Sequence, residues 1–362
     1  MPQVIDHKDG WGNCTVNFTG VKDSPDGVFN LHEQVNLLSH RSGWNYINEL
    51  LEPYHNSSAP IFDGFLEKTF SWFKDKHIHH GLLPRTSPWT AFLHNPHEMP
   101  EWFNYTASPQ SMFASDEFQQ SLPACEGLFV LSDWLRDWLK QQFPDLLVET
   151  IYHPGDIVDI QFDYPAFLAN TDKKVVAIGW WLRKLSSIYL LPTHRCRYVK
   201  YSKARTLPYE EGSVPIREML DPLLEREIQE LSVQADINVC SYTAPVETYY
   251  RLSNLEYDIL LSKNIGFIDV WDSSANNTVI ECIVRCTPLL ACRHPAIVEY
   301  LGEDYPMYFD DLEHAVSMLN DLELIRITHE YMKSRHEFVS GDRFIKSIMS
   351  SDIVNNIREK YL

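Results

Sequence analysis

The chain has 362 residues, of which 44% are hydrophobic and 22% charged, a composition typical of a folded protein long enough for two domains. It contains 31 Lys and Arg against 50 Asp and Glu, and the resulting net charge of -19 argues against a nucleic-acid partner. No stretch approaches the ~20 apolar residues that span a bilayer, and the seven Cys form no C-x-x-C, so we expect a reduced, cytoplasmic protein without a transmembrane segment.

The N-terminal half alternates predicted strands with helices. Residues 1–34 carry several Gly, Asp and Asn and are expected to form an irregular extension. The spacing of Trp44, Ile47 and Leu51 predicts a helix, and Ser132 is a good N-cap for another. Strands are expected at residues 34–40, 88–94, 127–131 and 148–152.

Pro165, Asn170 and Asp172 mark residues 162–173 as a linker. Beyond it the alternation resumes, and Ser253 and Glu256 form a capping box for one of the helices. This order predicts an α/β protein with two doubly wound halves, each built on a parallel sheet, and a helical tail from about residue 314. The strands expected in the second half are residues 174–178, 236–239, 265–270 and 288–292, and the helices are residues 216–231, 253–261 and 278–285.

The segment from 265 to 302 is the richest in candidate site residues. A buried strand is followed by small and polar residues, and a helix is expected to start at Thr278. Ligands bind beyond the carboxyl ends of parallel strands, and a helix N-terminus favours phosphate. Glu281, one turn into the helix, then suits a ribose diol, although Thr278 and Glu281 also match a capping box. The loop residues expected to contact a diphosphate are Ser273, Ala275, Asn276 and Asn277.

Gly179 ends another predicted strand, and Arg183 and Lys184 follow it closely. An Arg fork and a Lys point charge both suit phosphate. The simpler alternative is a solvated pair of surface cations, but both this loop and the loop before Thr278 leave strands of the same half.

The N-terminal half offers a second group of polar residues at strand ends. His94 ends a strand, where its imidazole would hydrogen-bond a sugar hydroxyl or a leaving phosphate, or serve only as a structural residue. A Gly in the turn after the first strand permits close approach of a ligand. The turn comprises Arg41, Ser42, Gly43 and Trp44.

Several common motifs are absent from the sequence. It has no P-loop, no G-x-G-x-x-G, no G-x-S-x-G and no D-x-D. The spacing of His77, His79, His80, His94 and His97 matches no standard zinc site. We therefore expect neither a metal nor a cofactor.

These residues resemble a retaining glycosyltransferase of the GT-B fold, similar to glycosyltransferase family 4. The family's donor domain begins with a strand, a Gly, an Arg and a Lys, and Gly179, Arg183 and Lys184 match. Glu281 matches the second Glu of the family's E-x7-E motif, while Ser273 stands where the first Glu is expected, with Asp272 the nearest carboxylate.

The resemblance implies two Rossmann-like domains facing a cleft and a C-terminal helix that crosses back. It places the acceptor-side domain at residues 1–165, the donor domain at 174–325, and helices that pack toward the first domain at 326–362. It implies metal-independent transfer, with retention, of a hexose or pentose from a nucleotide-diphosphate sugar to a hydroxyl, expected on a glycan or glycoconjugate, in carbohydrate biosynthesis.

Each candidate residue then takes a role. The catalytic residues are expected to be Asp272, His94, Arg183 and Lys184. The donor site adds Gly179, Ser273, Ala275, Asn276, Asn277, Thr278 and Glu281, and the acceptor-side loop is Arg41, Ser42, Gly43 and Trp44. The alternatives are a catalytically degenerate carbohydrate- or nucleotide-binding module of the same fold, and another GT-B enzyme such as an epimerase or a phosphorylase.

Overall fold

The chain folds into two compact units, which we describe separately. Unit 1 comprises residues 1–154 and 340–362, and unit 2 comprises residues 155–339. None of the helices in the described residues is long and apolar enough to cross a membrane. The structure, a computed structural model, describes residues 3–5, 14–17, 22–32, 34–36, 43–207, 216–235, 245–250 and 252–362.

Unit 1 is built on a parallel sheet of four strands in its described part, in the order β4-β5-β6-β7. Every residue of β5 is buried, which is typical of a parallel strand covered on both faces. The strands are β4 (Ile61–Asp63), β5 (Trp89–Leu93), β6 (Cys125–Val130) and β7 (Val148–Thr150). The helices of this unit are α1 (Trp44–Leu51), α2 (Lys74–His79), α3 (Pro109–Phe113), α4 (Asp116–Ser121), α5 (Asp133–Gln142), α14 (Gly341–Met349) and α15 (Asp352–Tyr361).

A small antiparallel sheet corrects the expectation for the N-terminus. Within residues 1–34 the described segments include strands, not only irregular chain: β1 (Gln3–Ile5) and β2 (Cys14–Asn17) pair with each other, and β2 pairs with β3 (Gln34–Asn36). The described part of the strand predicted at 34–40 therefore belongs to this sheet. The first strand of the parallel sheet is instead β4, whose three residues are too few to show a pattern.

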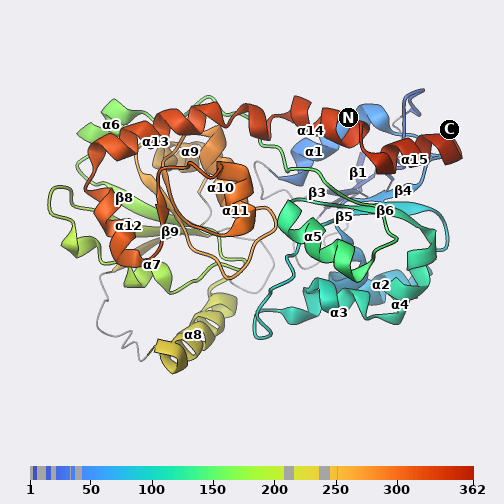
Figure 1. The fold of residues 1–362 in the computed structure, drawn as a ribbon, viewed down its shortest axis with the longest axis horizontal. Helices are drawn as coiled ribbons and strands as arrows, with labels where there is room; N and C mark the ends of the chain where they lie inside the picture. Colours follow the sequence, from blue (N-terminus) through green and yellow to red (C-terminus); the bar gives the residue numbers. More distant parts are fainter. Residues whose placement is uncertain are drawn as a thin grey trace. The chain divides into compact units, whose positions relative to one another are not determined.

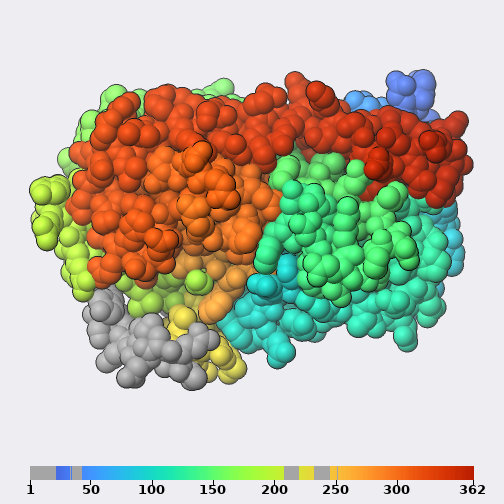
Figure 2. Space-filling view, in the orientation of Figure 1, coloured from blue at the N-terminus to red at the C-terminus, as the bar shows by residue number. Residues whose placement is uncertain are grey.

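The C-terminal helices α14 and α15 pack within unit 1 (Figure 1). Ile353 lies so close to Gly127 of β6 that a Cβ at Gly127 would come within 2.6 Å of its side chain. Glu126 of the same strand accepts hydrogen bonds from Tyr361 and from Lys360. In the space-filling view the red end of the chain lies directly against green residues of this unit (Figure 2).

Unit 2 is built on a parallel sheet of six strands in its described part, in the order β10-β9-β8-β11-β12-β13. These are β8 (Lys174–Ile178), β9 (Ser202–Leu207), β10 (Val246–Tyr250), β11 (Ile265–Ile268), β12 (Leu289–Cys292) and β13 (Tyr308–Phe309). The helices are α6 (Tyr164–Ala169), α7 (Ser187–Leu190), α8 (Ile216–Ala235), α9 (Asn254–Leu261), α10 (Asn277–Val284), α11 (Pro295–Leu301), α12 (Leu312–Leu319) and α13 (Leu322–Ser334).

The stretch predicted as a linker, residues 162–173, contains the helix α6. Asp163 is its N-cap, and Pro165 lies in its first turn. Proline is accepted there because the first N–H groups of a helix have no partner inside it. Pro165 is thus a helix-start signal where the sequence was interpreted as a loop. The strand predicted at 236–239 lies outside the described residues.

Candidate functional site

The carboxyl ends of β8 and β11 carry most of the predicted site residues of unit 2. β8 ends at Ile178, and Gly179 follows with a φ of 73°, a left-handed conformation that favours glycine. A Cβ at Gly179 would lie 3.4 Å from Nη2 of Arg183. The glycine therefore allows the chain to turn and the Arg183 side chain to fold back over that turn.

Arg183 lies at the N-terminus of α10. Its Nη2 donates to Oδ1 of Asn276 at 2.9 Å and to Oγ1 of Thr278 at 3.0 Å, and its Nη1 donates to the Trp181 carbonyl at 2.6 Å. Its Nε is buried and has no hydrogen-bond partner among the described residues. Burial lowers the pKa of Arg183 to about 10, against the opposing charge of Glu281. The loop after β8 and the loop before α10 therefore meet through Arg183, Asn276 and Thr278.

Lys184 is held differently from Arg183. Its Nζ lies 3.1 Å from Oδ1 of Asp269 and 5.7 Å from the centre of the Trp271 ring, and about a third of the side chain is exposed. Its backbone N–H donates to the Asp269 carbonyl. Each of the two cations thus has specific partners and is only partly exposed, while the role of the pair at a diphosphate stays a prediction.

Asn276, not Thr278, caps α10. Its side chain accepts from the N–H of Thr278 at 3.0 Å, so the helix begins at Asn277, one residue before the predicted start. Thr278 instead donates its hydroxyl to the Ile178 carbonyl. The capping box of Thr278 and Glu281 is therefore not formed, and the simpler interpretation of Glu281 is wrong.

The carboxylate of Glu281 accepts a hydrogen bond from the hydroxyl of Tyr257 on α9. Burial raises the pKa of Tyr257 well above its usual value, and the charge of Glu281 adds to this. The phenol therefore stays protonated and donates. Arg285 lies over the Tyr257 ring at 5.1 Å and pairs with Asp258 at 2.9 Å.

Asp272 is buried and pairs with His294, whose Nε2 lies 2.9 Å from its Oδ1. Nδ1 of His294 accepts from the N–H of Ala296, which makes His294 the N-cap of α11. Nε2 must then carry the proton that is donated to Asp272. Asp272 also accepts from the N–H of Ser273, and the Ser274 hydroxyl is buried without a hydrogen-bond partner in the described part of the chain.

The predicted residues of unit 1 that the structure describes are Gly43, Trp44 and His94. Gly43 is the N-cap residue of α1, and Trp44 is buried with its ring edge-on to His94. Arg41 and Ser42 lie outside the described residues. The acceptor-side role predicted for this turn stays a prediction.

His94 stacks on Phe65 at 4.0 Å between ring centres and donates from Nε2 to the Gly64 carbonyl at 2.8 Å. Burial lowers the pKa of His94 to about 3, so the ring is neutral at physiological pH. Its backbone N–H donates to Oε1 of the fully buried Glu67 at 2.7 Å. Burial raises the pKa of Glu67 to about 7.

Three further residues, Tyr257, His294 and Asp269, contact the predicted site residues but were not predicted from the sequence. His294 follows the strand predicted at 288–292, and a His at a strand end was the signal used for His94. Tyr257 and Asp269 carried no such signal, because a tyrosine in a helix and an aspartate beside a strand are common.

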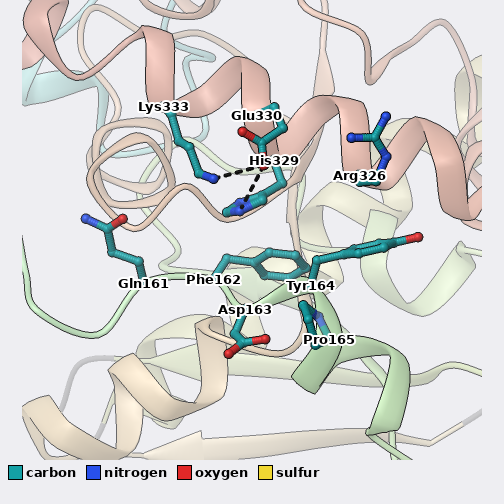
Figure 3. Close-up of a pocket in the computed structure, with 9 residues that line it drawn as sticks. All are labelled: Gln161, Phe162, Asp163, Tyr164, Pro165, Arg326, His329, Glu330 and Lys333. Carbon is teal, nitrogen blue, oxygen red and sulfur yellow. Dashed lines mark hydrogen bonds and ion pairs between the residues drawn. The ribbon is translucent and has the colours of Figure 1, made fainter.

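A cavity of about 510 Å³ in unit 2 lies elsewhere, between residues 161–165 and α13 (Figure 3). The rings of Phe162 and Tyr164 lie on one side of it. Its cations already face carboxylates: Lys333 pairs with Glu330 at 2.9 Å, and Arg326 pairs with Glu323. None of the predicted site residues lines this cavity, so it is not the candidate site.

The two units, each with a parallel sheet and surrounding helices, define the GT-B class of fold, as predicted. No protein-family model and no curated protein sequence matches the chain. Solved structures do match it, and trehalose-phosphate synthases are among them.

One is a UDP-forming α,α-trehalose-phosphate synthase from Burkholderia vietnamiensis, with 13% identity over 83% of this chain and 72% of that chain, at a TM-score of 0.51. Another is trehalose-6-phosphate synthase from E. coli bound with UDP-2-fluoro glucose. It shows 13% identity over 86% of this chain and 77% of that chain, at a TM-score of 0.51. A further trehalose-6-phosphate synthase shows 15% identity over 86% of this chain and 76% of that chain, at a TM-score of 0.53. At this identity the similarity establishes the fold.

Proposed function

We propose that the protein is a retaining glycosyltransferase that moves a sugar from a nucleotide-diphosphate donor to a hydroxyl acceptor, expected on a glycan. The observation that carries the proposal is the position of Arg183 at the N-terminus of α10, where it contacts Asn276 and Thr278. The N-terminus of a helix is itself a positive pole. A partly desolvated guanidinium at that pole is unfavourable alone, and an anion bound there would offset the cost.

A diphosphate fits this arrangement best. Lys184 adds a second cation next to Arg183, and Glu281 lies one turn into α10, where it would accept hydrogen bonds from the ribose hydroxyls. The E. coli neighbour is bound with UDP-2-fluoro glucose, which makes a UDP-sugar the first donor to test.

The same groups would assist the chemistry. The leaving diphosphate gains negative charge as the glycosidic bond breaks, and Arg183, Lys184 and the N–H groups of α10 would stabilise it without a metal. The sugar passes through an oxocarbenium-like state. We assign to Asp272 the place of the missing first Glu near that positive charge, while the hydrogen bond to the sugar expected of His94 in unit 1 stays a prediction. The leaving phosphate would accept the acceptor's proton on the same face.

One observation favours a second candidate, a binding module without catalysis. Ser273 stands in the position of the first Glu, and Asp272 is already hydrogen-bonded to His294. Such a module would still use Arg183 and Glu281 to hold the nucleotide.

The deciding experiment measures nucleoside diphosphate release and donor binding with a panel of nucleotide sugars, with and without EDTA. Release that persists in EDTA, and is lost in Arg183→Ala, supports the metal-independent enzyme. Arg195→Ala is the matched control, because this exposed arginine of the same unit pairs with Glu313. Donor binding without turnover would favour the binding module, and no binding of any donor would overturn both.

A further inference from the structure

Glu227 of α8 is a fully buried carboxylate in unit 2. Among the described residues, it accepts four hydrogen bonds, which come from two loops. Oε2 accepts from the N–H of Leu185 at 2.8 Å and from Nε1 of Trp271 at 3.2 Å. Oε1 accepts from the N–H of Ser186 at 2.8 Å and from its hydroxyl at 2.5 Å. Burying a carboxylate is costly unless it is hydrogen-bonded, and these four hydrogen bonds compensate the burial of Glu227.

The position of Glu227 on its helix is unusual. Leu220, Leu223 and Leu224 form the apolar face of α8, and they pack with Leu185. Glu227 continues that face at the spacing of three and four residues. A charged residue in line with three leucines is the signal in the sequence that this glutamate faces inward.

A buried cation, Arg205, binds the peptide group between Leu185 and Ser186 from the side opposite to Glu227. Arg205 of β9 donates from Nη2 to the Leu185 carbonyl. Burial lowers the pKa of Arg205, while nearby groups that include Glu227 oppose the shift. The Leu185 residue is therefore fixed at its N–H by Glu227 and at its C=O by Arg205.

The two loops that Glu227 joins are those that carry the candidate donor site. Leu185 and Ser186 directly follow Arg183 and Lys184, and Trp271 begins the loop that leads to Asn276. Stabilisation of a developing charge depends on donors that are held in place before the reaction.

We propose that Glu227 is a positioning residue, which fixes the loop of Arg183 and Lys184 relative to the loop before α10. This inference rests on the proposed function, because it gives Glu227 a role in holding the groups that would bind the diphosphate. Glu227 itself does not contact the donor.

The test compares Glu227→Gln with Glu230→Gln. Both make the same chemical change on α8, but Glu230 pairs with Arg226 one turn away on the same helix. Hydrogen exchange of the loop segments 180–187 and 271–276 is measured first, without any ligand. Affinity for UDP, ADP and GDP is measured next, in the wild-type and Arg183→Ala backgrounds.

Glu227→Gln is expected to speed exchange in both loops and to weaken nucleotide binding by roughly ten- to a hundredfold, the loss typical of hydrogen bonds to a charged group. Glu230→Gln should change neither. Because Arg183 is one of the groups that Glu227 would hold in place, Glu227→Gln should cost clearly less affinity in the Arg183→Ala background. Equal losses in both backgrounds would indicate a merely structural role and overturn the proposal.

The two proposals fail in different ways. Unchanged loop exchange in Glu227→Gln overturns the positioning role whatever binds. Faster exchange with unchanged affinity also overturns it, and leaves the proposed function standing. A wild type that binds none of the nucleotides overturns the proposed function and this role with it. If Glu227→Gln does not fold, Trp271→Phe removes one donor to Glu227 and should weaken binding by about two- to tenfold, and unchanged affinity there overturns the proposal.

Discussion

The phenol hydroxyl of Tyr257 on α9 donates a hydrogen bond to Oε2 of Glu281 on α10. The carboxylate that we expect to bind a ribose is therefore held from one side by a partly buried aromatic residue. Because Asn276 caps α10, Glu281 is not needed for the cap. The cap therefore places no requirement on residue 281, whereas the proposed ribose role requires a carboxylate there.

We expect Glu281→Gln to weaken nucleotide binding by about 1–3 kcal/mol, the usual cost of losing a charge-assisted hydrogen bond. Isothermal titration calorimetry with nucleoside diphosphates measures this directly. Glu256→Gln is the matched control, because Glu256 forms the capping box of α9 with Ser253 and glutamine serves that box as well. An unchanged dissociation constant in folded Glu281→Gln would exclude the ribose role.

Tyr257→Phe removes the phenol hydroxyl and leaves the ring over which Arg285 lies. We expect it to weaken binding by about 0.5–1.5 kcal/mol, the usual contribution of one hydrogen bond. The loss should shrink with 2′,3′-dideoxynucleotides, since they lack the hydroxyls that Glu281 would hold. A loss of the same size with both ligands would show that Tyr257 acts elsewhere.

The pH dependence of stability tests the shifted pKa values of two side chains in unit 1, the His94 imidazole and the fully buried Glu67 carboxyl. The folded pKa of His94 is lowered to about 3 from 6.5, so folding releases its proton at intermediate pH. The folded pKa of Glu67 is raised to about 7 from 4.5, so folding takes up a proton in the same region. Between about pH 4.5 and 6.5 the two effects nearly cancel.

Substituting either residue should reveal the pH dependence of stability that the other one contributes. In His94→Gln only Glu67 remains, and stability should rise as the pH falls through that window, by up to about 1.4 kcal/mol per pH unit. In Glu67→Gln only His94 remains, and the free energy of unfolding should decrease as the pH falls through the same window. Urea unfolding at several pH values measures both slopes. Slopes of the same sign in the two variants would show that these groups do not titrate as described.

Local signals in the sequence predicted more than long-range ones. The capping box of Ser253 and Glu256 is confirmed, because its partners are three residues apart and need nothing else. The start of α10 was misplaced by one residue, since Asn276 and Thr278 are both good caps, and Thr278 is drawn away by the Ile178 carbonyl and by Arg183.

Strand β9 was missed because Lys203 and Arg205 interrupt its apolar pattern. Both are buried, and each ends on backbone carbonyls: Lys203 donates to Tyr189 at 2.6 Å, and Arg205 donates to Leu185. Their acceptors are 14 and 20 residues away in the sequence. No pattern within the strand shows such partners, and the same holds for Glu227 and its two loops.

Asp272 provides a test of catalysis separate from binding. In Asp272→Asn the amide oxygen is still able to accept from His294 and Ser273, so the loop should keep its shape. The negative charge that we propose to lie near the sugar is lost, and we expect kcat to fall about 10²-fold with little change in donor affinity. Asp304→Asn, at an exposed position, should leave both unchanged. A wild-type kcat in Asp272→Asn would remove this residue from the mechanism.

Arg183 and Lys184 should matter more for the reaction than for donor binding. The charge on the diphosphate would grow as the glycosidic bond breaks, so in the proposed mechanism both cations would stabilise the transition state more than the bound donor. We expect Arg183→Ala or Lys184→Ala to lower kcat by about 10²–10³, the cost of removing one preorganised donor from an oxyanion site. Steady-state kinetics separates this from the change in KM.

The variants Arg183→Lys and Lys184→Arg should not reach the activity of the wild type. Arg183 uses both terminal nitrogens of its fork on Trp181, Asn276 and Thr278, which a single ammonium does not reproduce. Lys184 is a point charge 3.1 Å from Asp269, so the larger guanidinium would disturb that pair. A nucleotide complex in which the diphosphate lies beyond one bridging water from both residues would overturn the donor site and favour the binding module.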